Sequence, residues 1–114
     1  MLSIAFVEGI SQESEEMETA YSVKNVPIRL TYERWYHIIE NHDDLAGYFH
    51  DVLDTVENPE FVMQGNQGTL KATKNMGKKK WLVVIYKELS REDGFIITSY
   101  FLPGKPKGNI IWKR

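Results

Sequence analysis

Residues 80–87 read KWLVVIYK, and Trp81–Tyr86 is an uninterrupted run of six apolar or aromatic residues. A strand that is apolar on both faces needs cover on both sides, so this run predicts a central strand. Turn residues lie on both sides of it, at Met76-Gly77 and at Ser90–Gly94. The run therefore predicts the middle of an antiparallel sheet whose neighbouring strands are reached through short turns.

Further β segments lie on either side of this run. Thr69–Asn75 alternates between apolar and polar residues, and Phe95–Leu102 is a second β-rich stretch. Phe61–Met63 precedes a turn at Gly65–Gly68, and Asn109–Trp112 has the composition of an edge strand. The four longer segments, 69–75, 81–86, 95–102 and 109–112, predict a meander of four antiparallel strands in the second half of the chain.

Two amphipathic helices are predicted before the strands. The first follows Thr31, a good N-cap residue, and its apolar stripe ends at His42. The second runs from Leu45 to Val56 with apolar residues at i, i+3, i+4, i+7, i+8 and i+11, and Asn58-Pro59 ends it. The expected fold is α+β, with two helices packed on one face of a four-stranded antiparallel sheet.

The chain has 114 residues, which predicts a single domain. Residues 1–25 are expected to form an N-terminal extension, in which Leu2–Val7 is a candidate edge strand. Glu8–Thr19 is polar and acidic, so it is interpreted as a solvated loop or a short exposed helix. Residues 26–114 are expected to form the α+β core.

Composition excludes several classes of site. The sequence has no cysteine, which excludes disulfides, thiol nucleophiles and cysteine-based zinc sites. Its three histidines lack metal-ligand spacing, so neither a metal nor a cofactor is expected. No apolar run approaches the roughly 18 residues of a membrane span, and the N-terminus does not resemble a signal peptide. A cytoplasmic location is therefore expected.

The net charge of −2 conceals a strong asymmetry between the two halves. Residues 1–60 carry thirteen acidic and three basic side chains, whereas residues 61–114 carry eleven basic and three acidic ones. A basic half built of strands suits a phosphate-bearing partner such as RNA. Two simpler explanations remain open: the halves attract each other, or the lysines protect sheet edges against aggregation.

His42 is the sharpest single candidate for chemistry. It ends an otherwise apolar helical stripe, and an imidazole can exchange protons near neutral pH. The alternative is a histidine that interacts with the last carbonyl groups of its helix. Arg34 lies eight residues earlier, close to the same helical face, where it could hold a phosphate or form an exposed salt bridge.

The strands supply the other candidates. Lys71 and Lys74 are expected on opposite faces of one strand, where either could bind phosphate. Thr98 and Tyr86 place hydroxyl groups on the central strands. Such hydroxyls are usually satisfied core groups, although they could also orient a phosphate oxygen.

The order of several short motifs resembles that of the barnase–EndoU–colicin–RelE-like nuclease group, whose members are small domains associated with phages and bacteria. The motifs are Arg34-Trp35-x-His37-Ile38-x-x-x-His42, Glu57-Asn58-Pro59, the Gly65–Gly68 turn, Leu82-Val83-Val84-x-Tyr86 and Gly94-Phe95-Ile96-Ile97-Thr98-x-Tyr100. The resemblance covers residues 26–114 and implies a RelE-like fold and RNA cleavage without a metal.

The resemblance also implies site residues. His42 matches the helix-end histidine, Arg34 the helix arginine and Thr98 the late-strand hydroxyl, while Lys71 or Lys74 matches the strand cation. The chain departs from the family pattern after the histidine, where Asp43 and Asp44 replace proline and glutamate.

These observations lead to the hypothesis of a metal-independent endoribonuclease of toxin or phage-accessory type, with RNA as substrate and an antitoxin-like protein as a further partner. His42 would act as general acid or base, Arg34 with Lys71 or Lys74 would bind phosphate, and Thr98 would orient it. The alternatives are a non-catalytic module that binds nucleic acid or protein through the basic sheet, and a structural domain without a ligand.

Overall fold

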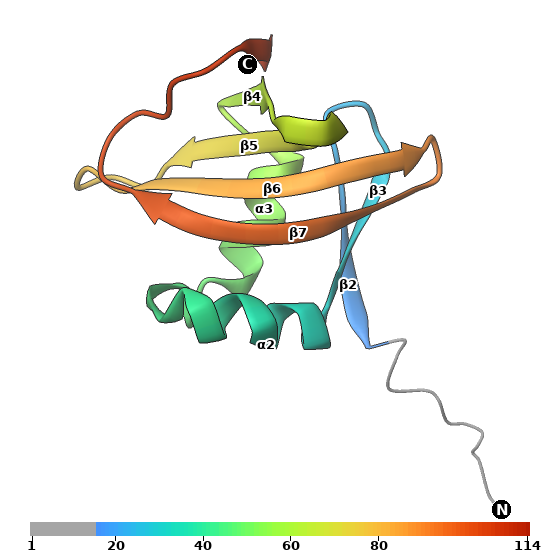
Figure 1. The fold of residues 1–114 in the computed structure, drawn as a ribbon, viewed down its shortest axis with the longest axis horizontal. Coiled ribbons are helices and arrows are strands. Elements are labelled where there is room, and N and C mark those ends of the chain that lie inside the picture. Colours follow the sequence, from blue (N-terminus) through green and yellow to red (C-terminus); the bar gives the residue numbers. More distant parts are fainter. Residues whose placement is uncertain (1–15) are drawn as a thin grey trace, which may run out of the picture.

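A computed structural model describes residues 16–114 (Figure 1). The expected strand Leu2–Val7 and most of the acidic segment lie outside the described residues. The helices are α2 (Tyr32–Asn41) and α3 (Phe49–Glu57). The strands are β2 (Met17–Tyr21), β3 (Pro27–Thr31), β4 (Phe61–Gln64), β5 (Leu70–Asn75), β6 (Trp81–Ser90), β7 (Asp93–Leu102) and β8 (Ile110–Lys113). None of the helices in this part of the chain has the length and apolar character needed to cross a bilayer.

The described strands form one seven-stranded mixed sheet in the order β2-β3-β7-β6-β5-β4-β8. The α+β class is what the structure shows, but the expected four-stranded antiparallel sheet is wrong. Strand β6 lies between β5 and β7, as its apolar run predicted. The expectation missed the β2–β3 hairpin, which joins the sheet through a parallel pairing of Arg29 with Phe95.

Strand β2 overlaps the end of the segment Glu8–Thr19, so the expected solvated loop or short exposed helix is wrong for Met17–Thr19. Strand β3 lies between the expected N-terminal extension and the first helix, where no strand was predicted. The turn of the β2–β3 hairpin is held by the Ser22 amide, which donates to the Val26 carbonyl over 2.9 Å, and by Asn25 at φ 64°. Ile28 and Leu30 alternate with polar residues, and both are 0% exposed. Two buried positions in five residues are too short a pattern to identify a strand in advance.

The first helix begins where the sequence predicts. The Thr31 side-chain oxygen accepts a hydrogen bond from the Arg34 amide over 3.0 Å, so Thr31 is the N-cap of α2. The second helix begins later than predicted, at Phe49. Leu45 belongs to the short 3-10 turn η2 (Asp43–Leu45), and Gly47 at φ +90° interrupts the helical path between them.

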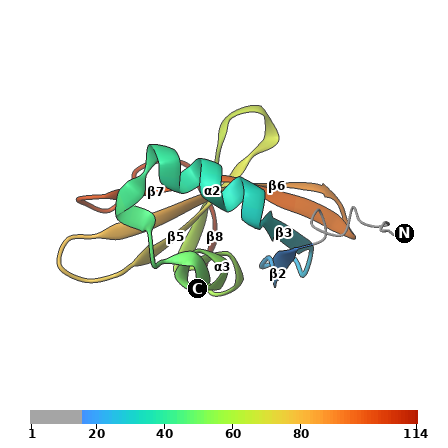
Figure 2. The ribbon, with the colours of Figure 1, turned by 90° about the horizontal axis from the view of Figure 1, so that it is seen from below.

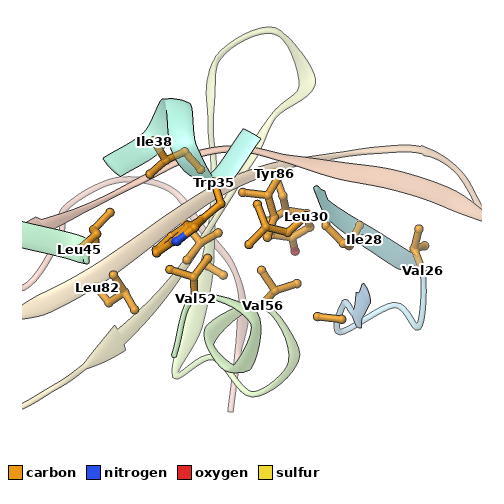
Figure 3. Packing of buried hydrophobic residues seen from close by; sticks show 14 residues of the cluster. Val26, Ile28, Leu30, Trp35, Ile38, Leu45, Val52, Val56, Leu82 and Tyr86 are labelled. Carbon is orange, nitrogen blue, oxygen red and sulfur yellow. The ribbon is translucent and has the colours of Figure 1, made fainter. Parts of the chain in front are cut away.

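The helices cover one face of the sheet, here called the helix face. Figure 1 shows α3 crossing behind β5, β6 and β7 while α2 runs beside β7, and Figure 2 shows the same arrangement from below. Trp35 and Ile38 of α2 and Val52 and Val56 of α3 pack on the sheet. Figure 3 shows this core, to which the sheet contributes chiefly Ile28, Leu30, Leu82, Val84, Tyr86 and Ile96.

The opposite side is here called the open face. Paired residues of an antiparallel ladder share a face, so the register assigns the side chains to three rows. These rows are Arg29–Phe95–Lys87, Thr98–Ile85–Lys71 and Tyr100–Val83–Thr73–Phe61. The loop of residues 103–109 covers the β4 ends of the second and third rows. Lys105 lies over the Phe61 ring, and Gly108 lies against Met63, the register partner of Lys71.

Candidate nucleic-acid interface

The structure separates the six predicted site residues into three groups. Thr98 and Lys71 lie on the open face in one row, with Ile85 between them. Arg34 and His42 lie at the two ends of α2. Lys74 and Tyr86 lie on the helix face and are considered separately below.

His42 lies directly after α2, where its amide donates to the Ile38 carbonyl over 2.8 Å. Its ring is half-buried, and the ring centroid lies 6.1 Å from that of Tyr100 on β7. Burial raises the pKa of the Tyr100 hydroxyl, which therefore remains protonated at neutral pH. The structure thus brings the predicted imidazole to the edge of the open face, next to a phenol.

Tyr100 was not among the predicted site residues, although its position could have been inferred. It lies two residues after Thr98, and alternate residues of a strand point to the same face. The sequence did not show that the end of α2 would lie beside it, since that contact depends on how the helix packs against β7.

Arg34 lies at the other end of α2 and lines a small cavity of about 150 Å³ with Arg29, Thr31, Phe95 and Ile96. The Arg29 guanidinium donates to both oxygens of Asp93, over 2.9 and 3.1 Å. Arg34 is exposed, and among residues 16–114 no carboxylate lies within salt-bridge distance of it. Its charge is therefore free to meet an anion at the Phe95 end of the open face.

Arg34 and His42 do not form a compact catalytic pair. Their backbones are eight residues apart, which corresponds to about 12 Å along a helix axis. The helix runs beside β7, with Arg34 near Phe95 and His42 near Tyr100. The two side chains can therefore contact different parts of an extended ligand more readily than a single phosphate.

The open face combines cations with half-buried aromatic rings. Lys87 and Arg29 flank Phe95 in the first row, and Lys71 belongs to the second row. Phe95 and Tyr100 are both only partly buried. In the sequence both residues belong to the motif Gly94-Phe95-Ile96-Ile97-Thr98-x-Tyr100, but neither ring was predicted as a stacking surface, because an aromatic residue in an apolar strand is more often part of the core.

Lys74 points to the helix face, where its register partner on β6 is the buried Leu82. Its ammonium group forms an ion pair and hydrogen bond with the Asp54 carboxylate of α3. Lys74 is therefore engaged in holding the helix on the sheet, on the side opposite to Lys71.

This ion pair makes the stability dependent on pH. The hydrogen bond from Lys74 holds the pKa of Asp54 below its ordinary value of 3.8. A second hydrogen bond, from the Asn58 side-chain amide, also lowers this pKa. The ion pair therefore stabilises the folded protein fully at pH values above the ordinary pKa of 3.8. This stabilisation is lost as the pH falls through the lower pKa that Asp54 has in the folded state. Because the pair is partly exposed, Asp54→Asn should lower the free energy of unfolding at pH 7 by less than about 1 kcal/mol.

Urea unfolding of the Asp54→Asn variant and the parent protein at pH 7 and at about pH 2 measures this effect. The difference between the two proteins should shrink at the acidic pH, where the parent carboxylate is protonated. An equal difference at both pH values would show that the ion pair contributes nothing to it.

Tyr86 is fully buried on the helix face, and no described group accepts or donates a hydrogen bond at its hydroxyl. Burial, with a smaller contribution from the Glu88 carboxylate, raises its pKa strongly. Tyr86 therefore lies among the core residues, where a ligand on the open face cannot reach it. The burial of Tyr86 on the helix face could not be predicted from the run Trp81–Tyr86, because a run of apolar residues does not distinguish one face of the strand from the other.

Comparison of the chain with protein-family models, with curated proteins and with solved structures finds no match.

Proposed function

We propose that this protein binds single-stranded RNA across the open face of its sheet. The observation that carries the proposal is the first row, in which Phe95 lies between Lys87 and Arg29, next to Arg34, which has no carboxylate partner among residues 16–114. Bases of an unpaired strand stack on aromatic side chains, and basic side chains contact the phosphates between them.

The charge of the open face favours a polyanion. On this face of β5, β6 and β7 the charged side chains are Lys71, Lys87 and Asp93. The charge of the Asp93 carboxylate is balanced by the Arg29 guanidinium, which donates two hydrogen bonds to it. Within the part of the chain that the structure describes, no carboxylate lies within salt-bridge distance of Lys71 or Lys87, and Arg34 adds a third such cation at the β7 edge.

The dimensions of the face suit an extended strand better than a compact ligand. Lys71 and Thr98 are separated by two strand spacings, which is roughly 10 Å. Arg34 and His42 extend the surface along β7 in the perpendicular direction. A chain of several nucleotides can contact these groups together, whereas one phosphate cannot.

The test is to compare the affinity for a single-stranded RNA oligomer at several salt concentrations. Lys71→Ala and Lys87→Ala should each weaken binding and reduce the slope of log K against log salt by roughly 0.7, one phosphate contact each. Lys24→Ala is the matched control, because Lys24 is an exposed lysine of the β2–β3 turn. If all three variants have the same slope, the open face is not the binding surface.

RNA cleavage without a metal is a second candidate, favoured by the proximity of His42 to Tyr100. In such a reaction the imidazole accepts the proton of a ribose 2′-OH, whose oxygen forms a bond to the adjacent phosphorus. The bond from phosphorus to the 5′-oxygen breaks, and a protonated group, for which Tyr100 is suitably placed, donates a proton to that oxygen. Thr98, on the same face, orients the phosphate in this proposal.

Cleavage is tested with mixed RNA in the presence of EDTA. His42→Ala should reduce the rate by a factor of roughly 100 or more, as expected for loss of a general acid or base. His37→Ala is the control, because His37 is an exposed histidine of the same helix. Equal rates in the two variants would reject the role of His42, and binding without cleavage would leave only the binding function.

A cytoplasmic location and an inhibitory protein partner belong to the cleavage proposal. A free ribonuclease would damage the RNA of the cell that makes it, so an inhibitor encoded nearby is expected.

A further inference from the structure

We infer that a pocket at the β4 end of the open face binds one nucleotide, with its base on Trp81 and its phosphate between lysines. The pocket has a volume of about 300 Å³ and is lined by Glu60, Phe61, Trp81, Lys105, Lys113 and Arg114. This inference extends the proposed function, since the pocket would hold one unit of the RNA, although it concerns different residues.

The register places this pocket on the open face. Phe61 is the β4 member of the third row, which leads through Thr73 and Val83 to Tyr100. Lys113 of β8 pairs with Phe61 from the other side. Three strand spacings, about 14 Å, separate Phe61 from Tyr100, so one RNA strand can contact both ends of this row.

The pocket has an aromatic wall. The Phe61 and Trp81 rings lie 5.8 Å apart at an interplanar angle of 48°. Phe61 is only 3% exposed, and the Lys105 ammonium group lies over its ring, 5.4 Å from the centroid. Trp81 is only partly buried, and its indole is the surface on which a base can stack.

The pocket also has a cationic rim. Among the described residues no carboxylate lies within salt-bridge distance of Lys105 or Lys113. The Arg114 guanidinium is positioned by a hydrogen bond to the Asn58 carbonyl over 2.9 Å. Glu60 is the one acidic residue of the lining, and its carboxylate accepts a hydrogen bond from the backbone amide of Asn75 over 3.0 Å. The three cationic side chains of the lining therefore outnumber its single acidic side chain and suit a phosphate.

The aromatic wall and the cationic rim together define the class of ligand. A ring surface without cations would suit a nucleoside, and cations without a ring would suit inorganic phosphate. The volume is at the lower end of the range for small-molecule sites, which fits a single nucleotide. A nucleoside monophosphate carries both recognised groups and is the smallest probe of the site.

The experiment is a titration of the whole protein with adenosine 5′-monophosphate, followed by the indole N–H resonances of the three tryptophans in NMR spectra. The Trp81 signal should shift with saturation, whereas the signals of Trp35 and Trp112 should move little. Lys113→Ala should weaken the affinity at least fivefold, and Lys107→Ala, an exposed lysine of the neighbouring loop, should leave it unchanged. Adenosine and inorganic phosphate should each bind at least tenfold more weakly than the nucleotide.

An unmoved Trp81 signal, or equal affinities in the two lysine variants, would overturn the inference. Trp81→Leu is a second check, with its thermal unfolding recorded to confirm that it folds. The outcome is separable from the RNA proposal, because Lys71→Ala should leave nucleotide binding intact. Nucleotide binding without RNA binding would reject only the proposed function, and RNA binding with an unresponsive Trp81 would reject only this pocket.

Discussion

Gly94→Ala is expected to lower the free energy of unfolding by about 2–3 kcal/mol. A Cβ atom at this position would lie 2.6 Å from the Lys87 carbonyl oxygen, 2.6 Å from the Ile28 Cδ1 atom and 3.3 Å from the Glu88 Cα atom. Two of these atoms belong to the backbone of the paired strand β6, and Ile28 is completely buried. The Lys87 carbonyl oxygen is backbone and cannot yield without moving β6, so the β6–β7 ladder must separate locally.

The substitution should also disturb the candidate interface, because the next residue, Phe95, pairs with Arg29 of β3. Thermal unfolding should show a decrease in Tm of roughly 10 °C. Gly104→Ala is the matched control, because a Cβ atom there meets nothing within 4 Å. A Gly94→Ala protein as stable as the control would mean that the two strands are not packed as closely as described.

Leu30→Ala is expected to cost about 2–5 kcal/mol, the range for truncation of a large aliphatic side chain in a filled core. Leu30 is 0% exposed on β3, and Figure 3 shows it beside Tyr86 among the residues that join the hairpin to the helices. Loss of its side chain leaves a cavity between three elements, which the surrounding residues cannot close without shifting α2.

Chemical denaturation of Leu30→Ala and of the control Leu89→Ala measures this cost. Leu89 is 53% exposed at the end of β6, so its truncation should change the free energy of unfolding by less than about 0.5 kcal/mol. Similar small losses in both variants would show that the β2–β3 hairpin is not an integral part of the core.

Much of the fold followed from local patterns. The run Trp81–Tyr86 identified a central strand, and Thr31 identified the start of α2. Both signals are short-range. The first depends on the apolar content of consecutive residues, and the second on a side-chain oxygen that accepts a hydrogen bond from the amide three residues later. Strand β3 was missed because its five residues become a strand only by pairing with β2 and β7.

The candidate site was predicted only in part for a similar reason. Alternation correctly separated Lys71 from Lys74, and it placed Lys71 on the same face as Thr98 once the register was known. It did not reveal which face the helices cover, so it did not show that Lys74 and Tyr86 lie on the helix face, opposite to Lys71 and Thr98. The approach of His42 to Tyr100 depends on packing between elements 58 residues apart in the chain.

By itself, the amino-acid sequence determined the two helical segments, the extended segments that follow α3 and the concentration of positive charge in the second half of the chain, because propensity, capping and composition act over a few residues. Only the tertiary structure decided that the sheet has a mixed seven-stranded order, and that cations and rings meet on the face without helices. Strand order, register and the choice of covered face depend on contacts between distant residues, and these contacts are settled by packing of the whole core.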